Sequence, residues 1–141
     1  MIAYFDTSAL IPLIVDEPAS AVCVRLWNEA ERVVSSRLLY PEARAALAQA
    51  ERMKRLGASE LEHAVQELDS LVSEISFLEL SADVAASAGD LAQAHGLRGY
   101  DAVHLASALL LNDQELVLVA GDHQLAAAAR NSGVAVAVTT Q

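Results

Sequence analysis

Residues 2–6 read IAYFD, a short apolar run that ends on an acid. Residues 116–122, LVLVAGD, repeat the pattern near the other end of the chain. Apolar runs of strand length are typical of strands that are buried on both faces of a parallel sheet. In such sheets, ligands bind beyond the carboxyl ends of the strands. The two stretches therefore predict an α/β fold with Asp6 and Asp122 at its functional edge.

Between these stretches, short apolar runs alternate with helical segments, as in an α/β domain with a mainly parallel five-stranded sheet. We expect strands at 2–5, 33–34, 75–80, 116–119 and 134–138, and helices at 8–15, 20–31, 37–56, 84–95, 101–111 and 124–130. One more helix should open at a capping box formed by Ser59 and Glu62, after Gly57 closes the helix before it.

Composition narrows the class of protein. A chain of 141 residues fits one domain spanning 1–141, and 54% hydrophobic residues exclude an intrinsically disordered chain. The net charge of −10 excludes a broad basic surface for nucleic acid. The lone Cys23 cannot form an internal disulfide, which suits a reducing compartment. With no signal peptide and no long apolar span, we expect a cytoplasmic protein that does not enter membranes.

Four acids are candidates for a shared site: Asp6, Glu42, Asp101 and Asp122. Each alone has a local explanation, as a helix N-cap, a turn residue or part of a solvated helix face. At separations of roughly 5 Å, each ionised pair would repel by about 3 kcal/mol, so four converging carboxylates would exceed the stability of a domain. Such a cluster needs protons or cations, and all-oxygen donors favour Mg²⁺ or Mn²⁺ over zinc. These metals support attack of water on a phosphodiester.

The sequence resembles the PIN-domain nucleases, and specifically the VapC-type toxins of bacterial toxin–antitoxin pairs. Four stretches carry the resemblance: IAYFDTSAL at 2–10, the segment from Ser35 to Glu42, LRGYDAVHLASAL at 97–109 and GDHQLAAAARNSGV at 121–134. Together they run from end to end of the chain, and the third is the most specific. The resemblance implies a three-layer α/β/α sandwich and metal-dependent RNA cleavage. It assigns both catalysis and ligation of Mg²⁺ or Mn²⁺ to Asp6, Glu42, Asp101 and Asp122.

The same resemblance implies partners. RNA would be the substrate, and a cognate antitoxin protein would bind the chain, which would form a homodimer or a toxin–antitoxin hetero-oligomer. The amphipathic segments 9–15 and 21–27 are where an antitoxin would bind, although ordinary core packing explains their apolar residues equally well.

Four further residues are auxiliary candidates. Thr7 and Ser8 either orient a ligand or bound water, or cap the following helix. Arg98 lies in a loop from which it can meet a phosphate. His104 is either a general acid or base, or a buried scaffold histidine, and its apolar neighbours favour the scaffold role.

Whether Glu42 can join the other acids depends on where its helix begins. Proline is tolerated only in the first turn of a helix, so Pro41 keeps Glu42 in place only if that helix begins late. The loops at 16–19 and 96–100, where substrate specificity is expected, contain no readable motif.

Two other functions compete with a nuclease. A phosphatase of the haloacid dehalogenase type uses Asp-x-Asp after its first strand, and Ser8 replaces the second acid here. A catalytically weak PIN-fold module for protein interaction or RNA binding is the stronger alternative. The presence of all four acids argues against it, and titration with a divalent metal would separate the two.

Overall fold

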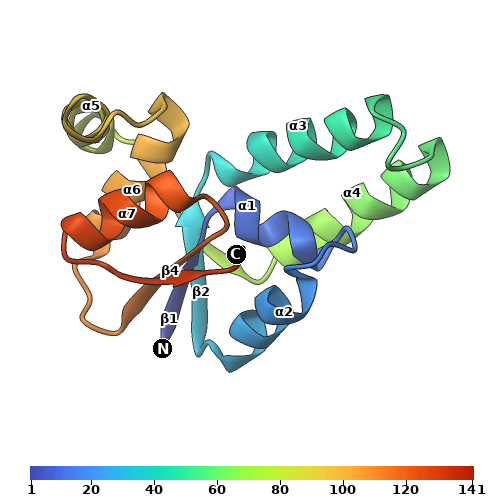
Figure 1. Cartoon of the computed structure of the whole chain (residues 1–141), viewed down its shortest axis with the longest axis horizontal. Coiled ribbons are helices and arrows are strands. Elements are labelled where there is room, and N and C mark those ends of the chain that lie inside the picture. The colour runs from blue at the N-terminus through green and yellow to red at the C-terminus, as the bar shows by residue number, and fades with distance from the viewer.

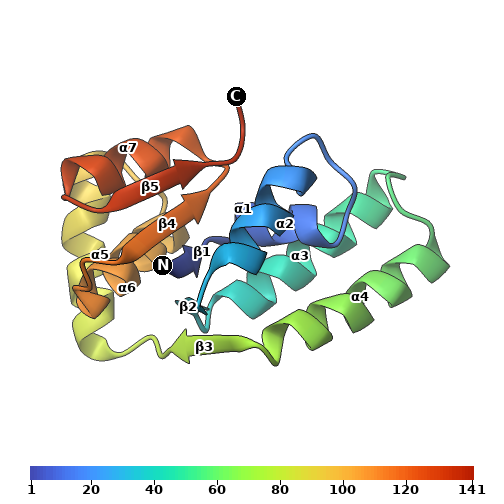
Figure 2. The same cartoon turned by 90° about the horizontal axis from the view of Figure 1, so that it is seen from below.

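The computed structural model describes residues 1–141 and contains a five-stranded sheet in which every neighbouring pair is parallel (Figures 1 and 2). The strand order is β3-β2-β1-β4-β5. The strands are β1 (Ile2–Phe5), β2 (Arg32–Ser36), β3 (Ile75–Leu78), β4 (Leu116–Ala120) and β5 (Ala135–Val138). All five strands expected from the sequence are confirmed, although β2 is longer and β3 shorter than expected.

Helices cover both faces of the sheet, so the three-layer sandwich is confirmed. They are α1 (Thr7–Leu10), the 3₁₀ turn η1 (Ile11–Leu13), α2 (Ser20–Glu29), α3 (Leu39–Arg52), α4 (Ala58–Val72), α5 (Ala82–His95), α6 (Gly99–Leu111) and α7 (His123–Asn131). Helices α1 to α4 enclose one core with Phe5, whereas α5 to α7 enclose a second core with Tyr4 (Figure 2). Successive residues of β1 thus face opposite cores, as the pleat of a strand requires.

The α3–α4 hairpin corrects two expectations. Helix α3 ends at Arg52, not at Leu56, because Lys54 takes a left-handed backbone conformation with φ 61°. Gly57 does not close α3 but precedes α4, where its backbone N–H donates to the Glu60 carboxylate at 3.0 Å. The expected capping box of Ser59 and Glu62 is therefore wrong, and the cap lies two residues earlier.

The chain reverses its direction of travel across the sheet at β1. From β1 it moves outward to β2 and β3, then crosses over to β4 and β5 on the other side. In open α/β sheets, this switch point forms a crevice beyond the carboxyl ends of the strands. Asp6 directly follows β1 and Asp122 closely follows β4, so both lie at this crevice. No helix is both long and apolar enough to cross a membrane.

Candidate active site

Asp6 directly follows β1 and caps α1, and it is only 3% exposed. Its Oδ2 accepts hydrogen bonds from the backbone N–H of Ser8 at 3.4 Å and from the Ser8 hydroxyl. The same hydroxyl accepts a 2.8 Å hydrogen bond from the backbone N–H of Gly121. Ser8 therefore ties the end of β1 to the end of β4 and orients Asp6, whereas the cap of α1 is Asp6 and not Ser8.

Glu42 lies in the first turn of α3, which begins at Leu39. Pro41 is the third residue of that helix, where its missing N–H costs no helical hydrogen bond, so the condition on Glu42 is met. The Thr7 hydroxyl donates to Glu42 Oε1 at 2.8 Å, and Nε2 of His104 lies 2.6 Å from the same oxygen. Both contacts fall on Oε1, which leaves Oε2 for another partner.

His104 is fully buried on α6 and connects three groups. Its Nδ1 shares a 2.8 Å hydrogen bond with the Tyr4 hydroxyl, and its Nε2 lies 3.5 Å from Asp6 Oδ1 as well as against Glu42. Burial lowers the pKa of His104, but the hydrogen bond to Glu42 and the charges of Asp6, Glu42 and Asp101 outweigh it and raise the pKa above 6.5. His104 is thus a fully buried residue hydrogen-bonded within the protein, and one of its partners, Glu42, is a candidate ligand.

Arg98 joins the remaining two acids. Its Nε lies 3.1 Å from Asp101 Oδ2, and a terminal nitrogen lies 3.4 Å from Asp122 Oδ2. Burial raises the pKa of Asp101, and the charges of Asp6 and Asp122 raise it further, against the opposing effect of Arg98. Asp122 also caps α7 by accepting from the Leu125 N–H at 2.9 Å. The structure thus shows Arg98 paired with acids rather than free for a phosphate.

All four sequence-predicted acids therefore lie at one edge of the sheet, joined through Ser8, His104 and Arg98. No three His, Cys, Asp or Glu side chains are arranged as a ready metal site. The donor set nonetheless fits a hard divalent cation, since it consists of carboxylate oxygens. A cation already bridges two of them, because the Arg98 guanidinium stands between Asp101 and Asp122. The position of Arg98 therefore marks where the Asp101 and Asp122 carboxylates need a neighbouring positive charge.

Sequence reasoning missed Tyr4 and Gly121. Tyr4 is buried in β1 and holds His104 from the side opposite Glu42. A tyrosine in an otherwise apolar strand was the available signal, because a buried phenol needs a hydrogen-bond partner. Gly121 acts through its backbone N–H, which no residue-type pattern reveals.

Comparison with known proteins gives the family. Two curated proteins, Ribonuclease VapC45 of Mycobacterium tuberculosis (strain CDC 1551 / Oshkosh) and Ribonuclease VapC49 of Mycobacterium tuberculosis (strain ATCC 25618 / H37Rv), are each 44% identical over 96% of this chain and 94% of their own. The family model described as PIN domain matches residues 3–131. The chain belongs to the PIN-domain family, in its VapC group. A solved structure, "Toxin-antitoxin complex from Klebsiella pneumoniae", shares the PIN fold with a TM-score of 0.70 at 22% identity, covering 99% of this chain and 98% of that one.

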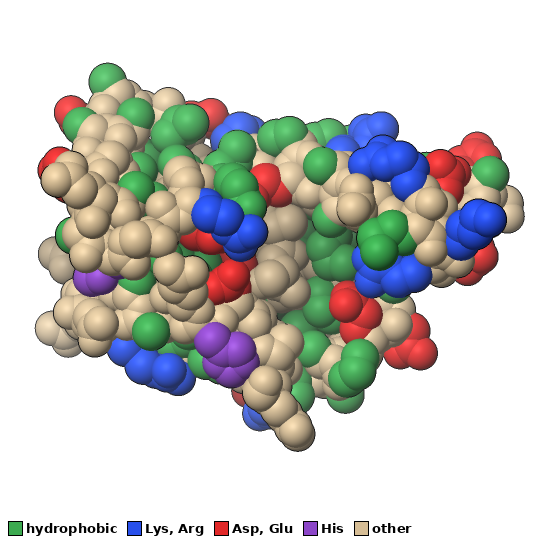
Figure 3. Space-filling view, turned by 45° about the horizontal axis from the view of Figure 1, so that its top comes forward, with side chains coloured by type: hydrophobic (Ala, Val, Ile, Leu, Met, Phe, Trp, Pro, Cys, Tyr) green, Lys and Arg blue, Asp and Glu red, His purple; other side chains and the backbone are tan.

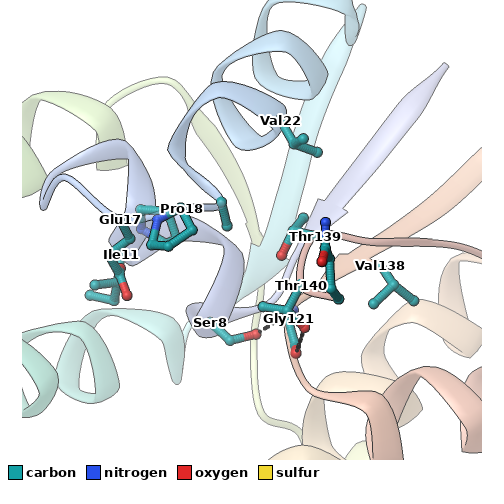
Figure 4. Close-up of a pocket in the computed structure, with 12 residues that line it drawn as sticks. Ser8, Ile11, Glu17, Pro18, Val22, Gly121, Val138, Thr139 and Thr140 are labelled. Carbon is teal, nitrogen blue, oxygen red and sulfur yellow. Dashed lines mark hydrogen bonds between the residues drawn. The ribbon is translucent and has the colours of Figure 1, made fainter.

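In this PIN domain, a pocket of about 850 Å³ is lined by Ser8, the residue whose hydroxyl contacts Asp6 (Figure 4). Ser8 and Gly121 line its inner end, so the pocket and the acids share the Ser8 hydroxyl. Glu17 and Pro18 line one wall, and Thr140 lines the other. The sequence indicated the loop at 16–19 as a place for specificity, but nothing in it predicted this cavity.

Proposed function

We propose that the chain is a metal-dependent endoribonuclease, the toxin of a type II toxin–antitoxin pair, acting in the cytoplasm. The gathering of Asp6, Glu42, Asp101 and Asp122 at the switch point of the sheet carries this proposal. The 44% identity to two ribonucleases, over nearly the whole chain, supports RNA as the substrate.

The four acids would hold one or two Mg²⁺ or Mn²⁺ ions, which supply Lewis acidity and lower the pKa of an attacking water. The protein's part is to fix the ligand oxygens. Ser8 orients Asp6, while Thr7 and His104 hold Oε1 of Glu42 and leave Oε2 available. Outer partners of this kind raise the affinity of a metal site by keeping its ligands in place.

His104 is assigned a positioning role rather than proton transfer. Its ring is fully buried and both of its nitrogens already have partners, so substrate cannot reach it. Arg98 would contact RNA only after leaving Asp101 and Asp122 for phosphate oxygens, an exchange that its 62% exposed side chain allows. In a chain of net charge −10, this local cation matters for attraction of the substrate.

Cleavage of a mixed RNA pool with Mg²⁺, Mn²⁺ or EDTA tests the proposal. Wild-type protein should cut only with metal, and Asp6→Asn and Asp101→Asn should lose at least 100-fold in rate. Asp90→Asn, an exposed acid on α5 with no side-chain partner, is the matched control and should cut like wild type. Cutting in EDTA, or full activity of either site variant, would refute the assignment. Absence of both cutting and Mn²⁺ binding would favour a catalytically weak interaction module.

We also propose an antitoxin protein as partner. The Klebsiella pneumoniae structure of the same fold, which is a toxin–antitoxin complex, supports this assignment. Expression of the chain in bacteria should arrest growth, and co-expression of the gene product encoded next to it should restore growth. Light scattering of the purified chain, alone and with that product, distinguishes a homodimer from a hetero-oligomer.

A further inference from the structure

The pocket that Ser8 and Gly121 line combines apolar walls with a few polar groups (Figure 4). Its apolar lining comes from Ile11, Pro12, Pro18, Val22 and Val138, which suits the faces of a planar group. Its polar groups sit among these apolar side chains at separate points of the wall. Small-molecule sites typically have this character, in which apolar walls hold the ligand and a few polar groups select it.

One polar group of the lining has no partner within the protein. The Glu17 carboxylate forms neither a hydrogen bond nor an ion pair, although the pocket contains it. Because this carboxylate is half-buried in the wall of the cavity and unpaired, it is free to accept hydrogen bonds from a ligand there.

Hydrogen bonds hold the backbone of Glu17 in position. Its backbone N–H donates to the Ser20 hydroxyl at 2.9 Å, and its carbonyl accepts from the Ser20 N–H at 3.0 Å, which fixes the loop at the start of α2.

We propose that this pocket binds the nucleobase next to the scissile phosphate, with Glu17 selecting guanine. The inference rests on the proposed nuclease function, because the pocket shares Ser8 and Gly121 with the carboxylate site. A nucleotide whose phosphate lies at the acids would direct its base toward the pocket, because Ser8 contacts Asp6 and also lines the pocket. Guanine presents two adjacent N–H donors, from N1 and N2, that match the two oxygens of one carboxylate, whereas uracil presents only one.

Titration of the protein with GMP, AMP, CMP and UMP in the presence of Mg²⁺, followed by amide NMR, tests the base pocket without RNA cleavage. GMP should bind at least 10-fold more tightly than UMP and shift the amides of Val22 and Thr139. Glu17→Gln should weaken GMP by about 10-fold or more and leave UMP nearly unchanged, since hydrogen bonds to a charged group are among the stronger ones.

Two variants complete the test. Asp16→Asn, which neutralises the neighbouring exposed acid outside the pocket, should bind all four nucleotides like wild type. Val22→Phe should block every nucleotide by filling the cavity while leaving charge unchanged. Equal affinities for the four bases, equal behaviour of Glu17→Gln and Asp16→Asn, or shifts confined to residues outside the pocket would overturn the proposal. Base selection without metal-dependent cleavage would refute the nuclease alone, and cleavage without base selection would refute the pocket alone.

Discussion

His104 Nε2 and Glu42 Oε1 lie 2.6 Å apart, although the two residues come from helices on opposite faces of the sheet. Tyr4, a residue of β1, shares a hydrogen bond with the other ring nitrogen of His104. The candidate site is thus bound into both cores of the protein. Figure 3 shows acidic side chains near the centre of the surface with a basic side chain against them, between the two lobes of helices.

Loss of His104 should destabilise the fold. In His104→Ala, the Tyr4 hydroxyl and Glu42 lose a buried partner and a cavity remains, which should lower the free energy of unfolding by about 2–4 kcal/mol. Urea denaturation measures the change. His63→Ala, at an exposed position of α4, should change stability by no more than about 0.5 kcal/mol. Equal effects of the two substitutions would contradict the linking role of His104.

The stability of the metal-free protein should depend on the protonation of His104. Its pKa is raised in the folded state, so folding favours the charged imidazole. This stabilisation is fully present below the ordinary pKa of about 6.5 and is lost as the pH rises through the folded-state value. Thermal unfolding in EDTA from pH 6 to 9 should therefore show a larger loss of Tm in wild type than in His104→Gln. Parallel curves for the two proteins would show that His104 does not titrate in this range.

Asp101→Asn should stabilise the metal-free protein. The raised pKa of Asp101 means that its ionised form is disfavoured in the fold, and the neutral amide removes that cost while keeping the shape. Differential scanning fluorimetry in EDTA should show a higher Tm than wild type, whereas Asp90→Asn should show no change. A lower Tm for Asp101→Asn would mean that its ion pair with Arg98 outweighs the repulsion.

Metal binding should reverse that order. Mn²⁺ at about 100 times its Kd should stabilise wild type by about 2.7 kcal/mol, or roughly 10 °C in Tm. Asp101→Asn should show little of this shift, because one ligand of the proposed site is lost, and Asp90→Asn should show all of it. Identical shifts in all three proteins would place the metal elsewhere.

Ser8→Ala should weaken metal affinity without removing a ligand. The substitution frees Asp6 from the hydroxyl that holds it and leaves the Gly121 N–H without its acceptor, which should raise the Kd for Mn²⁺ by about 10-fold. Calorimetric titration measures this, with Ser8→Thr as the control that keeps the hydroxyl. If Ser8→Thr weakens binding as much as Ser8→Ala, the hydroxyl is not the group that matters.

The sheet and the position of the acids were predictable because their signals are local. A run such as IAYF has the length and apolarity of a strand buried on both faces, and an acid that follows it must lie at the carboxyl edge. Helix ends were harder to predict, since Gly57 fits either a C-cap or an N-cap. The left-handed turn at Lys54 decided between them.

Residue patterns along the chain thus predicted the architecture, the family resemblance and the four candidate acids. Folding alone brought together side chains that are far apart in sequence: Glu42 with His104 across 62 positions, Tyr4 with His104 across 100, and Ser8 with the Gly121 backbone across 113. The pocket likewise arises from segments at both ends of the chain. Periodicity reports which face of its own element a residue occupies, whereas these contacts depend on how separate elements pack, which no local pattern encodes.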